Sequence, residues 1–116
     1  MPRVVHFEIY GKKPNNLMDF YFRVFNWTFE KWGEMDYWII KTGKGPGIDG
    51  GLGTRRGPSN ITIEVPDVDA CLKKIQQAGG TVALPKTTMP GVGYLAYFKD
   101  PQGNIFGIMK NDPTAT

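Results

Sequence analysis

One order of predicted elements occurs twice along the chain, and it constrains the fold more than any single motif does. Residues 3–10, RVVHFEIY, alternate apolar and polar side chains in the manner of a β-strand. A helical pattern follows from Asn16 to Phe25. Three further segments then read as strands, at 27–32, 36–42 and 50–55.

The second half repeats this order. A strand at 60–65 precedes a helix that begins after Asp67 and ends at Gly79, and the remaining strands are predicted at 81–85, 93–99 and 104–110. His6 and Asn60 occupy equivalent places at the start of the two halves. We therefore predict an α+β fold, one domain over residues 1–116, made of two β-α-β-β-β modules at 1–57 and 58–116.

The ends of the two helices carry capping signals. Asn16 is a predicted N-cap, and Asp19 falls in the first turn, where the helix dipole favours an acid. Asp67 is the corresponding cap of the second helix. A set of apolar side chains at helical spacing predicts one buried face on the first helix: Leu17, Phe20, Tyr21, Val24 and Phe25.

The segment YLAYFKDPQGNIFGIMK, residues 94–110, predicts a hairpin around Asp100–Asn104. Side chains alternate along a strand, so Ile105, Gly107 and Met109 share one face of its second arm. A glycine inside a strand marks a bulge or a close approach. Gly107 is therefore a candidate site position.

Composition excludes several classes of function. The apolar fraction is 41%, and no apolar run approaches the roughly 20 residues of a membrane span. The net charge is +3, but the basic residues are scattered in pairs, so we expect no nucleic-acid partner. The start, MPRVVHFEIY, has no signal-peptide pattern, and a single cysteine forbids an internal disulfide. We expect a cytoplasmic protein without a membrane partner.

Four segments together resemble the vicinal oxygen chelate superfamily, which includes glyoxalase I, extradiol dioxygenases and bleomycin resistance proteins. They are the first strand with His6, DFYFRVFNWTFEKW, EVPDVDACLKKIQQAGG and the closing FKDPQGN. The resemblance implies paired β-α-β-β-β modules whose curled sheets surround a cleft. It also implies a homodimer, which the 13% aromatic content favours.

The same resemblance implies that metal-dependent members hold a divalent ion on cleft-facing strand positions. Here His6 matches a ligand position, but Asn60 stands where His is usual and Gly107 where Glu is usual. The segment GGLGTR supplies no carboxylate either. One imidazole and a neutral amide are a poor set for a divalent metal. We predict no metal and no cofactor, and a cleft in which Gly107 leaves room for a small molecule.

The predicted ligand-binding residues are His6, Glu8, Trp38, Asn60, Thr62, Tyr94 and Gly107. Glu8 or Glu64 could pair with His6 for acid–base work, and several Trp and Tyr side chains, Tyr37 among them, could line an aromatic pocket. Three functions stay open: metal-free binding of an apolar or aromatic molecule, a metal-dependent lyase, isomerase or dioxygenase of the glyoxalase type, and a structural or regulatory dimer. The sequence names no catalytic residue and leaves open whether any reaction occurs.

Overall fold

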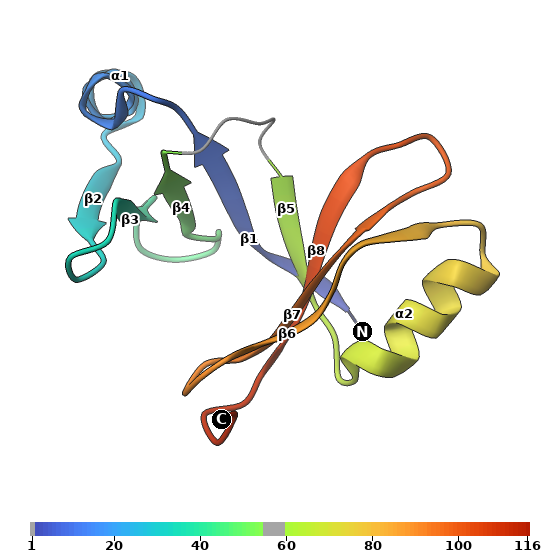
Figure 1. Cartoon of the computed structure of the whole chain (residues 1–116). Coiled ribbons are helices and arrows are strands. Elements are labelled where there is room, and N and C mark those ends of the chain that lie inside the picture. Colours follow the sequence, from blue (N-terminus) through green and yellow to red (C-terminus); the bar gives the residue numbers. More distant parts are fainter. Residues whose placement is uncertain (1, 55–59) are drawn as a thin grey trace. The chain divides into compact units, whose positions relative to one another are not determined.

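The computed structural model describes residues 2–54 and 60–116, which form eight strands and two helices (Figure 1). In chain order they are β1 (Arg3–Tyr10), α1 (Pro14–Phe25), β2 (Thr28–Lys31), β3 (Tyr37–Lys41), β4 (Gly50–Gly53), β5 (Asn60–Glu64), α2 (Val68–Gln77), β6 (Thr81–Met89), β7 (Gly93–Lys99) and β8 (Ile105–Asn111). The predicted α+β fold and the repeated β-α-β-β-β order are confirmed.

The chain divides into two compact units, His6–Asn60 and Met1–Val5 with Ile61–Thr116. The predicted module boundary at residues 57 and 58 lies outside the described residues, so it stays a prediction. In the described ranges, neither helix is long and apolar enough to cross a membrane.

Within the His6–Asn60 unit the strand order is β2-β3-β4-β1. β3 runs antiparallel to β2 and β4, whereas β4 runs parallel to β1. The register pairs Glu8 with Gly51 and Gly51 with Ile39, so these residues share one face of the sheet. The opposite face carries Phe7, whose ring packs near Trp27 at a centroid distance of 5.7 Å.

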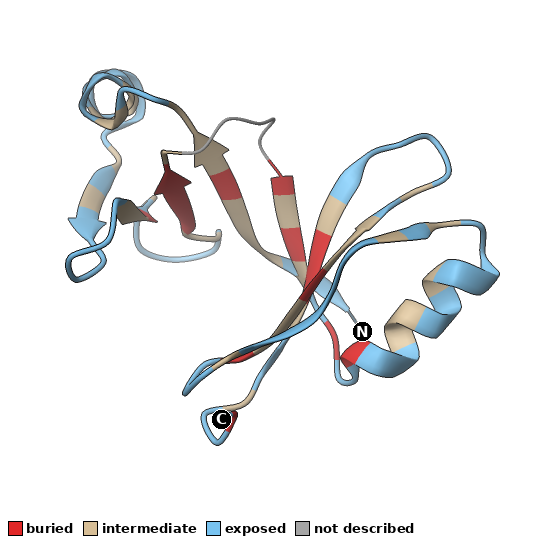
Figure 2. Ribbon diagram, viewed as in Figure 1, coloured by how far each residue is buried: buried red, intermediate tan, exposed pale blue. Residues whose placement is uncertain are grey.

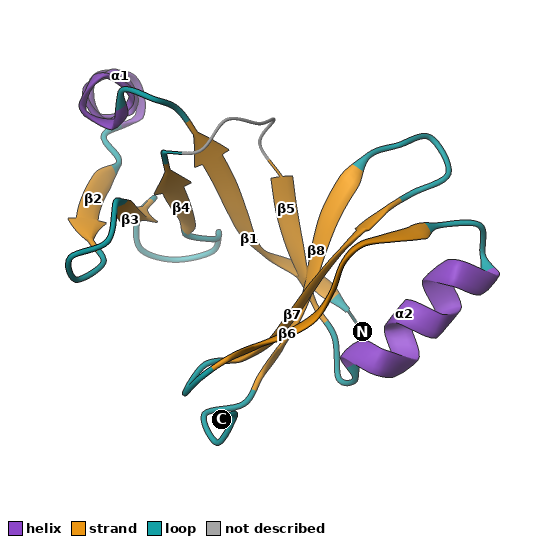
Figure 3. Ribbon diagram, in the orientation of Figure 1, coloured by secondary structure: helices purple, strands orange, loops and turns teal. Residues whose placement is uncertain are grey.

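Within the other unit the strand order is β5-β8-β7-β6. Its core lies between α2 and the sheet, where Val65, Val68, Ala96 and Ile108 are buried. Half-buried side chains of α2, Cys71 among them, pack against this core. Figure 3 shows α2 alongside the strands of this unit, of which it contacts β6, β7 and β8. Burial raises the pKa of the Cys71 thiol, which favours its protonated form.

The first helix differs from its prediction at its start. α1 begins at Pro14, with Lys13 at the N-cap and no side-chain cap, because the fixed φ of proline suits the first helical position. Asn16 is therefore inside the helix and is not the cap. Asp19 lies beyond the first turn and pairs with Arg23 at 3.0 Å. The Asp67 cap of α2 is confirmed, since its carboxylate accepts from Ala70 N at 3.0 Å.

The predicted buried face of α1 is wrong for three of its five residues. Leu17 and Tyr21 are half-buried, and the Tyr21 ring stacks on Trp27 at 5.2 Å. Phe20, Val24 and Phe25, however, are each more than half exposed, and Figure 2 shows α1 mainly in the exposed colour. The helix packs against β2, the short outer strand of this unit, which covers too little of its apolar surface.

The hairpin of the second unit is confirmed. β7 and β8 pair antiparallel from Gly93–Asn111 to Lys99–Ile105. Asp100 holds the turn by accepting from the backbone N–H of Gln102 and Asn104 at 2.8 and 3.0 Å. β6 is longer than predicted and runs past Pro85 to Met89, which an outer strand tolerates because one of its sides needs no backbone donor.

Candidate functional site

His6 and Glu8 come together on one face of β1. They are two residues apart in a strand, so their side chains point the same way, and His6 Nε2 contacts Glu8 Oε2. The Glu8 side chain is 12% exposed and that of His6 is 32% exposed. Glu8 is therefore the supporting member of the pair, and His6 is the member that a ligand could reach.

Tyr37 joins this pair from β3. Its hydroxyl donates to Glu8 Oε2 at 2.5 Å and lies 3.4 Å from His6 Nε2. β4 separates β3 from β1, so the two side chains meet above Gly51. A Cβ built on Gly51 would overlap the Tyr37 hydroxyl and the Glu8 carboxylate. The glycine in this strand thus makes room for an internal hydrogen-bonded cluster, which we call the His6–Glu8–Tyr37 cluster.

Asn60 makes a second polar contact in the same unit. Its Nδ2 donates to the Tyr10 hydroxyl at 3.2 Å, and Tyr10 alternates onto the face of β1 that carries His6 and Glu8. The residue is 8% exposed, and its Oδ1 is buried without a hydrogen-bond partner among the described residues. A buried orphan acceptor costs free energy, so it is a candidate contact for a ligand.

Thr62 and Gly107 lie together in the other unit as a cross-strand pair of β5 and β8. A Cβ at Gly107 would meet Thr62 Oγ1 and the Tyr97 ring, each at 3.1 Å. Tyr97 is the β7 partner of Gly107 and covers it. The room expected beside Gly107 is therefore already filled within this unit, and the glycine serves close packing of an aromatic ring.

Two of the predicted residues face the helix side of their sheets. Trp38 pairs with Leu52, on the face opposite to the one that carries Glu8 and Gly51. Tyr94 packs against the core beneath α2 and alternates away from Leu95 and Tyr97. Within its own unit, Trp38 is therefore on the face opposite to Glu8, and Tyr94 is on the face opposite to Tyr97, the partner of Gly107.

Three of the predicted residues are buried polar groups. In residues 2–54 and 60–116, the buried polar or charged residues are Glu8, Asn60 and Thr62, at 9%, 8% and 3% exposure. All three belong to the predicted set. Buried polar groups are unfavourable unless they are satisfied, and this makes them informative about function.

Sequence reasoning missed two members of this face. Tyr37 was considered only as a pocket aromatic, and its hydroxyl contact with Glu8 was not anticipated. Tyr10 shares the strand alternation of His6 and Glu8 but is not among the predicted binding residues. The run of glycines in β4 was the available signal, because glycine inside a strand marks close approach of other groups.

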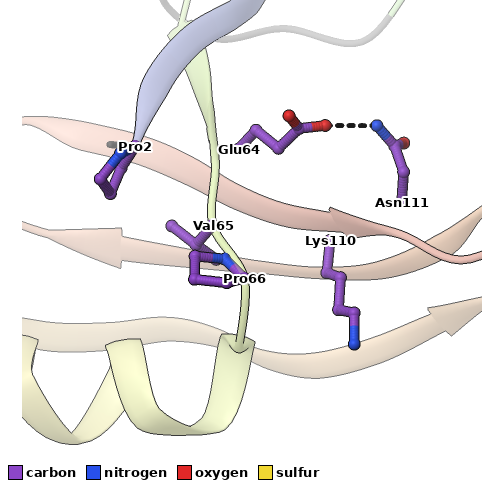
Figure 4. Close-up of a pocket in the computed structure, with 6 residues that line it drawn as sticks. All are labelled: Pro2, Glu64, Val65, Pro66, Lys110 and Asn111. Atoms are coloured by element: carbon purple, nitrogen blue, oxygen red, sulfur yellow. Dashed lines mark hydrogen bonds between the residues drawn. The ribbon is translucent and has the colours of Figure 1, made fainter.

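The unit that contains α2 has an open pocket of about 440 Å³ at the ends of β5 and β8 (Figure 4). Its lining includes Pro2, Val65 and Pro66, and Glu64 accepts from Asn111 Nδ2 at 2.5 Å. Lys110 points to the opposite side of the strand from this pair, as Figure 4 shows. None of the seven predicted residues lines this pocket, and the Glu64 carboxylate is engaged by Asn111 at a strand end.

Comparison with known proteins adds the family. The model of the Glyoxalase/Bleomycin resistance protein/Dioxygenase superfamily matches residues 3–108. The chain belongs to this superfamily. The predicted resemblance is thereby confirmed over most of the sequence.

Individual relatives match less completely. A Mycobacterium bovis protein named "Putative glyoxylase CFP32" is 39% identical over 54 residues, which is 47% of this chain and 21% of that protein. The chain thus spans about a fifth of the length of this curated relative. A superfamily member from Vibrio splendidus has a TM-score of 0.70 at 16% identity, covering 96% of this chain and 100% of that one. Methylmalonyl-CoA epimerase from Mycobacterium tuberculosis has a TM-score of 0.68 at 13% identity, covering 95% and 88%. At such identities these structures show the shared fold alone.

The superfamily resemblance implies a divalent metal, and the residues present do not fit one. His6 Nε2 is engaged by Glu8, Asn60 offers a neutral amide, and Gly51 and Gly107 offer no side chain. No group of three or more His, Cys, Asp or Glu is placed to hold a metal in the part of the chain that the structure describes. Divalent transition metals need several such donors in a fixed geometry.

Proposed function

We propose that the chain binds a small apolar or aromatic molecule without a metal ion, on the face of the His6–Asn60 unit that carries the His6–Glu8–Tyr37 cluster. The observation that supports this most is the arrangement above Gly51. There the Tyr37 hydroxyl and the Glu8 carboxylate occupy the space in which a metal-binding side chain from β4 would have to lie. The hydrogen-bonded His6–Glu8–Tyr37 cluster is therefore present here in place of a set of metal-binding side chains.

The surroundings of the cluster suit such a molecule. Gly51, Gly53 and the half-buried Ile39 share its face and give it an apolar floor. Small-molecule sites are mostly apolar, with a few placed polar groups that fix the orientation of the ligand. His6, one-third exposed and backed by Glu8, would be such a group.

A saturation experiment tests this proposal. The chain contains one histidine, so its ring signals in an NMR spectrum belong to His6. We expect at least one of a panel of small neutral, cationic and anionic aromatic compounds to shift these signals saturably. Exchange of Tyr37 for Ala should remove the response. If no compound in the panel shifts the His6 signals, this proposed function is wrong.

A metal-dependent lyase, isomerase or dioxygenase has less support, because the described residues bring no set of metal donors together. The third possibility, that the dimer interface is the functional part of the protein, is compatible with ligand binding.

We propose that the chain forms a homodimer, because apolar side chains of α1 are exposed and large exposed apolar patches mark interaction sites. A single cysteine and no possible internal disulfide favour the cytoplasm as its compartment.

A further inference from the structure

We propose that this face selects molecules that donate hydrogen bonds and rejects anions such as carboxylates and phosphates. The inference rests on the proposed function and concerns the chemical class of the ligand. It follows from the direction of the hydrogen bonds around Glu8 and from one buried, unpaired acceptor.

The contact with Glu8 determines which nitrogen of His6 carries the proton. Its Nε2 contacts the Glu8 carboxylate, which can only accept a hydrogen bond when ionised. A hydrogen bond at this contact therefore needs the His6 proton on Nε2. In the neutral imidazole with that tautomer, Nδ1 is an acceptor. The partly exposed ring then offers a lone pair to the ligand.

Tyr37 is a second donor to the same carboxylate. Its hydroxyl hydrogen is directed at Glu8 Oε2, 2.5 Å away. The donors of both His6 and Tyr37 are thus turned inward to one carboxylate. A ligand anion would need these donors, and their use would leave the buried Glu8 carboxylate without its partners, which is costly.

The buried acceptor of Asn60 is independent of Glu8. Asn60 is more than nine-tenths buried, and its Nδ2 is occupied by the Tyr10 hydroxyl, whose oxygen accepts this bond. The Oδ1 of Asn60 has no partner among the described residues. It can be satisfied by a donor and not by an anion.

The charges on the strands of this unit also disfavour an anionic ligand. By register, the titratable side chains on this face are Glu8, Tyr10, Glu30, Tyr37 and Lys41, together with His6. Lys41 is the cation that these strands place there, and its Nζ lies 3.8 Å from Asp49 Oδ2. Among the described residues of β1 to β4, this face therefore presents no cation that lacks a carboxylate partner.

Matched probes test the inference. Benzyl alcohol and benzylamine donate hydrogen bonds, whereas benzoate is an anion of similar size. We expect both donors to shift the His6 NMR signals with at least about tenfold tighter apparent affinity than benzoate, the size of one hydrogen bond to a charged or buried group. Glu8→Gln should remove most of this preference. Glu64→Gln, which removes the same charge at an exposed strand end, should leave it unchanged.

A second readout keeps the test independent of variant folding. The ring ¹⁵N shifts of His6 in the unaltered protein should show the proton on Nε2 and a bare Nδ1. Benzoate binding as tightly as benzyl alcohol, or a proton on Nδ1, would overturn the inference while leaving the proposed function intact. If none of the three probes shifts His6, both the proposed function and this inference fail.

Discussion

Tyr37 and Glu8 stand on strands that are not neighbours, yet the Tyr37 hydroxyl reaches Glu8 Oε2 at 2.5 Å. Strands two places apart in a sheet are separated by about 9.6 Å, twice the usual spacing. The two side chains span this distance by passing over Gly51, where no Cβ stands in their way. A hydrogen bond between side chains thus depends on a glycine of the strand between them.

Removal of the Tyr37 hydroxyl tests the strength of this contact. Tyr37→Phe should lower the free energy of unfolding by about 1.5–3 kcal/mol, because it takes a donor from a buried carboxylate. Urea unfolding monitored by fluorescence measures this. Tyr21→Phe is the matched control: the Tyr21 ring stacks on Trp27, but its hydroxyl has no hydrogen-bond partner among the described residues. An equal loss in both variants would show that the Glu8 contact contributes nothing.

A methyl group added at Gly51 tests the packing above β4. Gly51→Ala should destabilise the protein by about 1–3 kcal/mol, the usual cost of overpacking, because the new Cβ overlaps Tyr37 and Glu8. The cost should shrink when the same change is made in a Tyr37→Ala background. A double-mutant cycle of unfolding free energies measures the difference. If the free-energy changes of Gly51→Ala and Tyr37→Ala simply add in the double variant, the overlap of the new Cβ with Tyr37 is contradicted.

Low pH should weaken the turn between β7 and β8. Hydrogen bonds, first from the Asn104 side chain and then from backbone N–H groups, hold the pKa of Asp100 below its ordinary value of 3.8. The unfolded chain then binds this proton more readily than the folded one. The stabilisation is complete above pH 3.8 and is lost as the pH falls through the lowered folded pKa.

NMR titration of the Asp100 carboxyl carbon measures this shift directly. In Asp100→Asn, the loss of stability on acidification should be smaller than in the unaltered protein. Asp36→Asn is a matched control at another exposed position. An NMR titration midpoint of Asp100 at or above pH 3.8 would disprove that hydrogen bonds in the turn stabilise the ionised carboxylate.

Self-association should depend on α1. Light scattering at micromolar concentration should give a mass of twice 13.0 kDa. Phe20→Ser, at a side chain that is 52% exposed, should shift the protein towards monomer because it removes apolar area from the proposed interface. Leu84→Ser, at a 39% exposed position of β6, should not. A clean monomer mass for the unaltered chain would contradict the homodimer.

The sequence predicts the elements well because their signals are local. Strand alternation around His6 and the Asp67 cap depend on neighbours in the chain, and the structure confirms them. The start of α1 was mispredicted because Pro14 and Asn16 both suit a helix N-terminus, and proline took the first position.

The site was less predictable because it depends on register between strands. Alternation along β1 places His6 beside Glu8, and this was foreseen as one possible pair. That Tyr37 reaches Glu8 depends on β4 lying between their strands, which no spacing along the chain reveals. The face of Trp38 likewise depends on its pairing with Leu52.

Elemental analysis after mild purification shows whether this member of the superfamily functions without a metal at His6. We expect zinc, nickel, iron and manganese each to be far below one ion per chain, with no change in His6→Ala, because Asn60, Gly51 and Gly107 supply no charged donors. Close to one such ion per chain in the unaltered protein, lost in His6→Ala, would contradict the account and favour the metal-dependent enzyme.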